Sequence, residues 1–239
     1  MDTYFYLHMN FSQLRKDVLS IPNYFEQFGE PLRSSADEIK AYTVDSFRLM
    51  VTAFGRMTFM GCVRYCYSRR SKAQVAYENA LELMKRNVMV PQPVGYIEQK
   101  SSLKLVKSFL ITCLVDYRPV ADVMKYLDSQ KKNQLFQGFA FFLYSLHAKG
   151  IFHANLNMSN VLCKTAGGGF EFCLSDTINV RFQRSSERRV LKNMANMAMS
   201  LELFITVITE YALLTKQDPN TLFDRLLKLR NKAGRVHAH

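Results

Sequence analysis

The chain has 239 residues, 48% of them hydrophobic, so it is long enough to bury the core of one domain or of two small lobes. Lys and Arg number 32 against 20 Asp and Glu, and the formal net charge of +12 favours anionic partners such as phosphorylated ligands, acidic lipid surfaces or nucleic acid. The longest apolar-rich segment, 135–146, is too short to cross a bilayer, and no basic segment precedes the apolar residues of the N-terminus, as a secretory signal would require. Five cysteines, an odd number, favour reduced thiols over a disulfide framework. We therefore expect a cytoplasmic protein.

The first half of the chain is predicted to combine strands with a single helix. We expect four strands, at 38–44, 48–54, 94–98 and 108–116. Between the two pairs, Ser71 is the predicted N-cap of a helix that continues to about residue 86 with a regular apolar stripe. This order predicts a small N-terminal lobe over residues 1–116, with an antiparallel sheet and one helix, in which the first ~30 residues are an extension.

The second half is predicted to be mostly helical. Helices are expected at 134–149, 187–214 and 219–230. Two short strands, 161–164 and 170–174, flank a glycine-rich hairpin turn at 166–169. The sequence thus predicts a larger, mainly helical C-terminal lobe over residues 117–239, and the fold class is α+β.

The most informative motif follows the first of these helices. The run FHANLNMSN at 152–160 contains His153, Asn155 and Asn160, and an apolar strand then leads to Asp176. In protein-kinase-like catalytic loops, the pattern His-x-Asp-Leu is followed by an Asn five residues after the Asp, and this Asp accepts the proton of the attacking hydroxyl. Asn155 occupies the position of that Asp. The motif therefore resembles a kinase catalytic loop that lacks its general base.

Segments 71–80 and 91–98, together with this loop, resemble the bacterial lipopolysaccharide core kinases, which phosphorylate Kdo or heptose sugars of the inner core. The resemblance covers roughly residues 30–230 and is most specific around the catalytic loop. It implies a protein-kinase-like fold of two lobes, with the catalytic loop at 152–162 in the larger one. It also implies ATP and Mg²⁺ as cofactors and a lipid-linked core sugar as the phosphoryl acceptor.

The resemblance assigns roles to single residues. Asp176 matches the Asp that holds Mg²⁺ against the β- and γ-phosphates, and Asn160 matches the second metal-binding residue. His153 matches the His that orients the loop. Glu78 matches the Glu that pairs with the small-lobe Lys, and Thr52 occupies the position expected for that Lys. The metal-binding positions are thus retained, whereas the general base and the phosphate-binding cation are substituted.

Two functions are consistent with these substitutions. Loss of a general base typically lowers a rate by about 10²- to 10⁴-fold, so a core sugar kinase of reduced activity is one of them. The other is a pseudokinase that binds nucleotide, membrane or a partner. Arg56, with the same strand parity as Thr52, and Lys40, on the neighbouring strand, are candidate replacements for the missing cation.

Each site residue also has an ordinary structural interpretation. Glu78 is consistent with an exposed helix residue, and His153 with a buried histidine whose hydrogen bonds are satisfied. Asn155 and Asn160 are residue types that commonly form turns, and Asp176 is of a type that caps them.

Segment 59–72 combines cations with apolar and aromatic residues, a mixture typical of contact with an anionic membrane surface. Such contact would place the protein at the periphery of the inner membrane, where a lipid-linked sugar is presented. A solvated loop folded back on the small lobe is the alternative. No nucleic-acid-binding motif accompanies the positive charge, so nucleic acid is not the expected partner. The sequence does not indicate an oligomeric state.

Overall fold

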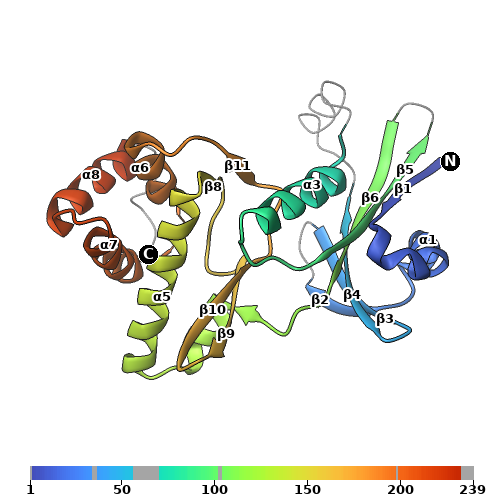
Figure 1. Cartoon of the computed structure of the whole chain (residues 1–239), viewed down its shortest axis with the longest axis horizontal. Helices are drawn as coiled ribbons and strands as arrows, with labels where there is room; N and C mark the ends of the chain where they lie inside the picture. The colour runs from blue at the N-terminus through green and yellow to red at the C-terminus, as the bar shows by residue number, and fades with distance from the viewer. Residues whose placement is uncertain (1, 34–36, 56–69, 102–103, 198, 233–239) are drawn as a thin grey trace. The chain divides into compact units, whose positions relative to one another are not determined.

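The computed structural model describes residues 2–33, 37–55, 70–101, 104–197 and 199–232, and the chain divides into two compact units, Met1–Val115 and Asp116–His239 (Figure 1). The first unit is built on a sheet and the second is mainly helical. Each unit has its own buried core.

The first unit contains a six-stranded antiparallel sheet. Its strands are β1 (Asp2–Leu7), β2 (Glu30–Arg33), β3 (Asp37–Val44), β4 (Phe47–Phe54), β5 (Pro93–Ser101) and β6 (Lys104–Cys113). In space they follow the order β1-β5-β6-β4-β3-β2. The tight turn between β3 and β4 places Asp45 at a positive φ of 51°, which aspartate tolerates better than most residues. The four expected strands are all present.

One face of this sheet is covered by the N-terminal helices η1 (Met9–Leu14) and α1 (Arg15–Tyr24). Their buried residues Leu14, Val18 and Ile21 pack in one cluster with Val51 and Phe109 of the sheet. The sequence analysis set the first 30 residues aside as an extension. In the structure they supply β1, which pairs with β5, and much of the core on this face.

The opposite face is covered by α3 (Lys72–Lys85). Ser71 is its N-cap, as expected, and its side-chain oxygen accepts a hydrogen bond from the Gln74 N–H at 3.0 Å. Tyr77 of this helix packs against Tyr6 and Tyr96 of the sheet, with ring centroids 5.2 and 5.6 Å away. Strand alternation therefore separates two sets of side chains, one facing α1 and the other facing α3.

The second unit is organised around one long helix. Its helices are α4 (Val120–Val123), η2 (Met124–Tyr126), α5 (Ser129–Ala148), α6 (Glu187–Ala195), α7 (Leu201–Leu214) and α8 (Pro219–Lys232). Its strands are β7 (Arg118–Pro119), β8 (Ile151–His153), β9 (Val161–Ala166), β10 (Gly169–Leu174) and β11 (Val180–Phe182). Helix α5 lies between helices α6–α8 and the β9–β10 hairpin (Figure 1).

The single helix expected over 187–214 is in fact two helices, α6 and α7. Asn196 caps the end of α6, and Ser200 begins α7 by accepting a hydrogen bond from the Leu203 N–H at 3.4 Å. Both are residue types that bind backbone groups at helix ends. The apolar and methionine-rich composition of the region concealed this break.

Helix α5 delivers the chain to the motif region through Gly150. This residue has a φ of 68°, and a Cβ placed on it would lie 2.3 Å from the carbonyl oxygen of Gln183. Glycine is required here by both the backbone conformation and the close approach. The Gln183 N–H in turn donates to the Gly150 carbonyl at 2.9 Å, so the segment after β11 is held against the start of β8.

Candidate active site

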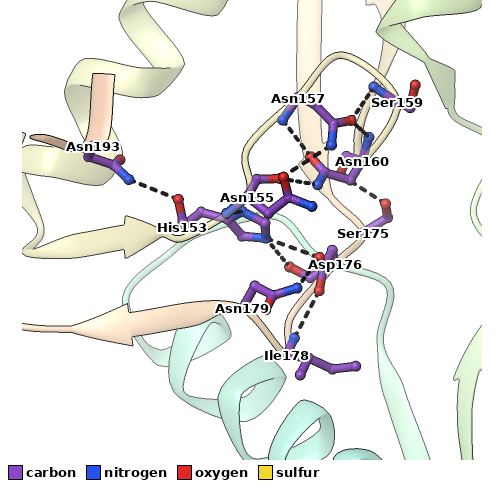
Figure 2. Close-up of polar contacts among 10 residues, drawn as sticks. All are labelled: His153, Asn155, Asn157, Ser159, Asn160, Ser175, Asp176, Ile178, Asn179 and Asn193. Atoms are coloured by element: carbon purple, nitrogen blue, oxygen red, sulfur yellow. Dashed lines mark hydrogen bonds and ion pairs between the residues drawn. The ribbon is translucent and has the colours of Figure 1, made fainter. Parts of the chain in front are cut away.

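The motif loop lies between β8 and β9, and asparagine side chains shape it (Figure 2). Oδ1 of Asn157 accepts hydrogen bonds from the backbone N–H groups of Ser159 and Asn160, at 2.8 and 3.1 Å. The Asn157 N–H donates to Oδ1 of Asn160 at 3.0 Å. These local side-chain-to-backbone bonds replace regular secondary structure and give the loop a defined shape.

His153 joins this loop to Asp176. Its Nδ1 accepts the N–H of Asn155 at 3.2 Å, and its Nε2 lies 2.9 Å from the carbonyl oxygen of Asp176. A backbone N–H can only donate and a carbonyl can only accept, so the ring is neutral and carries its proton on Nε2. His153 is therefore both a satisfied buried histidine and the connection between the two parts of the site.

Asn160 is buried and fixed at both ends of its amide. Nδ2 donates to the Asn155 carbonyl at 2.6 Å, and Oδ1 accepts the Asn157 N–H. The backbone carbonyl of Asn160 also accepts from the N–H and the hydroxyl of Ser175, at 3.1 and 2.9 Å. Asn160 thus forms the turn and also lies beside the residue that precedes Asp176. Its Oδ1 retains one lone pair.

Asp176 is a carboxylate held by donors from its own turn and by His153, whose Nε2 lies 3.5 Å from Oδ2. Oδ1 accepts the N–H of Ile178 at 3.1 Å, and Oδ2 accepts from Nδ2 of Asn179 at 2.8 Å. Burial alone would raise the pKa of Asp176, but hydrogen bonds from His153 and Asn179 outweigh it and hold the pKa below the ordinary value of a carboxyl. Asp176 is therefore negatively charged at neutral pH.

Asp176 and Asn160 are the oxygen donors that the site could offer to a metal ion. Within the described ranges no group of three or more His, Cys, Asp and Glu side chains could enclose a metal ion. Mg²⁺ typically uses one or two protein carboxylates and completes its octahedral shell with phosphate oxygens and water. Asp176 and the free lone pair of Asn160 are the protein oxygens that could take part in such a shell.

Asn155 differs from its neighbours because its side chain is exposed and unused. Its backbone carbonyl accepts Nδ2 of Asn160 and Nδ2 of Asn157, the latter at 3.3 Å. Its side-chain amide makes no hydrogen bond to any residue in the described part of the chain. The loop therefore presents a free amide at the position where a kinase-like loop presents a carboxylate.

In the first unit, Glu78 has a partner that the sequence analysis did not assign. Its Oε2 lies 3.0 Å from Nη1 of Arg70, and its Oε1 accepts from Nε2 of Gln74 at 2.9 Å. Thr52 is half-buried on β4, between Ile39 and Leu110 of the neighbouring strands. The cation that pairs with the helix carboxylate thus comes from the residue before the N-cap rather than from β4. The spacing of Arg70 and Glu78, about two helical turns apart at the start of α3, was the sequence signal that could have predicted this ion pair.

Lys40 does not replace the missing cation, contrary to the sequence-based hypothesis. It faces α1, whereas Thr52 points to the α3 face. Its Nζ donates to the carbonyl oxygen of Phe25 at 2.6 Å and lies 4.9 Å from the centre of the Phe25 ring. Lys40 is therefore a buried residue that ties β3 to the end of α1. Arg56, the other candidate, lies outside the described residues.

A buried chain of hydrogen bonds anchors the loop from behind. The Asn193 amide nitrogen donates to the His153 carbonyl at 2.8 Å (Figure 2), and its oxygen lies 3.0 Å from Nε2 of His147. Nδ1 of His147 lies 2.9 Å from the Tyr211 hydroxyl. Burial lowers the pKa of His147 to about 4, so the ring is neutral at neutral pH; with its proton on Nε2 donated to Asn193, Nδ1 accepts from the Tyr211 hydroxyl. Three helices, α5, α6 and α7, thereby fix the strand that leads into the loop.

The buried His147 in this series of hydrogen bonds makes the stability of the protein depend on pH. Burial lowers the pKa of His147 from 6.5 to about 4. Below pH 6.5 the unfolded chain binds a proton at His147 that the folded chain does not bind until about pH 4, so stability is full above pH 6.5 and falls as the pH decreases. We expect His147 to contribute about 3 kcal/mol of this loss, from 1.36 kcal/mol per pKa unit.

The measurement is the free energy of unfolding by urea between pH 7 and pH 4, for the wild type and for His147→Gln. The variant is expected to be less stable at neutral pH but to lose less stability on acidification. Asp176 is present in both proteins, so the stability that it loses as the pH falls toward and below 3.8 cancels in this comparison. Parallel pH profiles for the two proteins would contradict the assignment.

A two-lobed chain with this loop, an antiparallel sheet and a helix that carries a paired glutamate has a protein-kinase-like fold. Residues 65–224, more than half of the chain, match the lipopolysaccharide kinase (Kdo/WaaP) family, and the chain belongs to that family. Among solved structures it is similar to WaaP in complex with acyl carrier protein, with a TM-score of 0.64 and 14% identity. That match covers 98% of this chain and 100% of the other. A search of curated proteins gives no match.

The part of the chain that the structure describes contains no helix long and apolar enough to span a membrane.

Proposed function

We propose that the protein transfers the γ-phosphoryl group of ATP to a hydroxyl of a Kdo or heptose sugar on a lipid-linked lipopolysaccharide core, at the cytoplasmic face of the inner membrane. The observation that carries the proposal is the bridge made by His153, which binds the Asn155 N–H on one side and the Asp176 carbonyl on the other. In this proposal the bridge would hold the acceptor-binding position next to the metal-binding position.

Asp176 and Asn160 are the residues that would hold Mg²⁺ in this proposal. When bound, the ion would neutralise charge on the β- and γ-phosphates. Asn155 would hydrogen-bond the acceptor hydroxyl and orient it, and it would leave the hydroxyl proton without a carboxylate acceptor. Because positioning and charge neutralisation contribute most of the stabilisation in phosphoryl transfer, slow turnover is compatible with an amide at this position. Arg70, paired with Glu78, takes the place of the strand lysine as the partner of that carboxylate.

A second candidate function is a pseudokinase that binds nucleotide or a partner without turnover. The exposed amide of Asn155 and the neutral Thr52 favour it, since they remove the general base and the strand cation together. The structural relative WaaP is in complex with acyl carrier protein, so a protein partner belongs to this candidate.

The experiment that separates the candidates measures Mg²⁺–ATP binding by calorimetry and phosphoryl transfer from labelled ATP to a lipopolysaccharide core acceptor. Binding with labelling supports the kinase. Binding without labelling supports the pseudokinase. The absence of both binding and labelling would contradict the kinase and limit the second candidate to partner binding.

A further inference from the structure

A group of exposed cations follows Asp176 in the chain. We call it the cationic strip, and it consists of Arg181, Arg184, Arg188, Arg189 and Lys192. The single acidic residue in this stretch, Glu187, is 2.6 Å from Nη1 of Arg225 on α8, so its charge is already paired. None of the five cations lies within ion-pair distance of a carboxylate from the described residues. The strip is therefore a run of exposed positive charges along this part of the chain.

The strip begins beside the catalytic loop. Arg181 on β11 is the register partner of Phe152 on β8, and the Ala154 N–H donates to the Asn179 carbonyl at 2.8 Å. Arg181 is thus two positions, or ~7 Å, along the strand from Ala154, and Asn155 is the next residue. The contact between Gly150 and Gln183 holds the next residues to the same strand.

The rest of the strip follows the turn into α6 and the exposed side of that helix. Arg189 donates from Nη1 to the Arg184 carbonyl at 2.8 Å, which fixes the turn. Helix α6 buries Leu191 and Met194, and it exposes the three cations at its positions 188, 189 and 192. The positive surface is thus built on regular structure that starts at the candidate site.

Like charges at this density repel one another, and they are tolerated at low cost when the surface meets an anionic ligand. Guanidinium groups pair with phosphates and carboxylates through two parallel hydrogen bonds, and four of the five cations are arginines. A ligand with several phosphates and carboxylates next to a sugar hydroxyl would match both the charge of the strip and its position.

We propose that the cationic strip binds the phosphate and carboxylate groups of the core glycolipid, and that this contact places one of its sugar hydroxyls at Asn155. The inference rests on the proposed function and adds to it the surface that recognises the acceptor. The strip selects an acceptor whose anionic groups adjoin the sugar that is phosphorylated, and a neutral sugar of the same stereochemistry binds poorly.

The test compares Arg181→Gln/Arg184→Gln with a matched control, Lys131→Gln/Lys132→Gln, that removes the same charge. The control lysines lie in the first turn of α5, at the end of this helix that is far from β8 and the catalytic loop. At 1.5 Å per residue the two ends of this helix are on the order of 25 Å apart. Binding is measured by flotation with vesicles that contain deep-rough lipopolysaccharide, at low and high salt.

We expect the arginine variant to bind these vesicles about 20-fold more weakly than the wild type, and the control to bind within about twofold of it. Wild-type binding should weaken as salt rises. Equal losses in both variants, or no loss in the arginine variant, would overturn the proposal. Equal wild-type binding to phosphatidylglycerol vesicles of the same charge would also overturn it, since the surface would then recognise a membrane and not the acceptor.

The glycolipid-binding test can fail or succeed independently of the proposed kinase function. Mg²⁺–ATP binding with no binding of the glycolipid would overturn the cationic strip as an acceptor surface and leave the nucleotide site intact. Arginine-dependent binding of the glycolipid by a protein that binds no nucleotide would support the strip and contradict the kinase.

Discussion

Replacing Asn155 by aspartate is expected to raise the rate of phosphoryl transfer by roughly 10²- to 10⁴-fold, the usual contribution of a positioned general base. The change supplies a carboxylate where the loop now presents an amide. Since the N–H and the carbonyl of Asn155 make the hydrogen bonds that hold the loop, the side chain can change without disturbing them. The measurement is the initial rate with labelled ATP and a core acceptor.

The control is Asn157→Asp, which adds the same charge two residues away. Oδ1 of Asn157 accepts the Ser159 and Asn160 N–H groups, as a carboxylate also does, so the variant loses only the 3.3 Å hydrogen bond from Nδ2 to the Asn155 carbonyl. An equal gain in both variants would show that added negative charge and not its position is responsible. An unchanged rate in Asn155→Asp would contradict the placement of the acceptor hydroxyl at residue 155.

Asp176→Asn is expected to have the opposite effect and to lower turnover by on the order of 10³-fold, because it removes the carboxylate proposed to hold the metal. Magnesium-dependent affinity for ATP should fall with it. The new amide would also face Nδ2 of Asn179, so one hydrogen bond of the turn is lost. Calorimetric titration of ATP with and without Mg²⁺ measures the effect.

The matched control is Asp122→Asn, a more exposed aspartate on α4 whose Oδ1 pairs with Lys125 at 2.7 Å. This variant should keep wild-type affinity and turnover. Melting temperatures of both variants show whether the fold is intact. Full Mg²⁺-dependent affinity in a folded Asp176→Asn protein would place the metal elsewhere.

Local sequence patterns predicted the order of elements because each signal lies within a few residues. The strands β3 and β4 with the tight turn between them, the Ser71 cap of α3 and the asparagine-rich loop all depend on neighbours in the chain. Strand β1 was not predicted, since its stability comes from pairing with β5, which lies about 90 residues later. Only Phe5 and Leu7 of this strand pack against the core, and both are partly buried.

The misplaced and missed site residues share the same cause. Lys40 and Thr52 are on adjacent strands, but which face of the sheet each one meets depends on α1, whose packing was not predicted. Similarly, His147 and Asn193 lie on different helices, and in the sequence alone each one is an ordinary helix residue. Only their meeting behind His153 gives them a role, and such long-range contacts leave no local pattern.

The hydrogen bonds that anchor the motif loop also affect the order in which the protein folds during synthesis. Asn193 is 40 positions after the residue whose carbonyl it binds, and Tyr211 is 64 positions after its partner His147. During synthesis the loop therefore emerges from the ribosome well before the residues that hold it. At 5 to 20 residues per second it waits roughly several seconds for them. A chain halted before α6 would display the whole motif without the support that keeps it in shape.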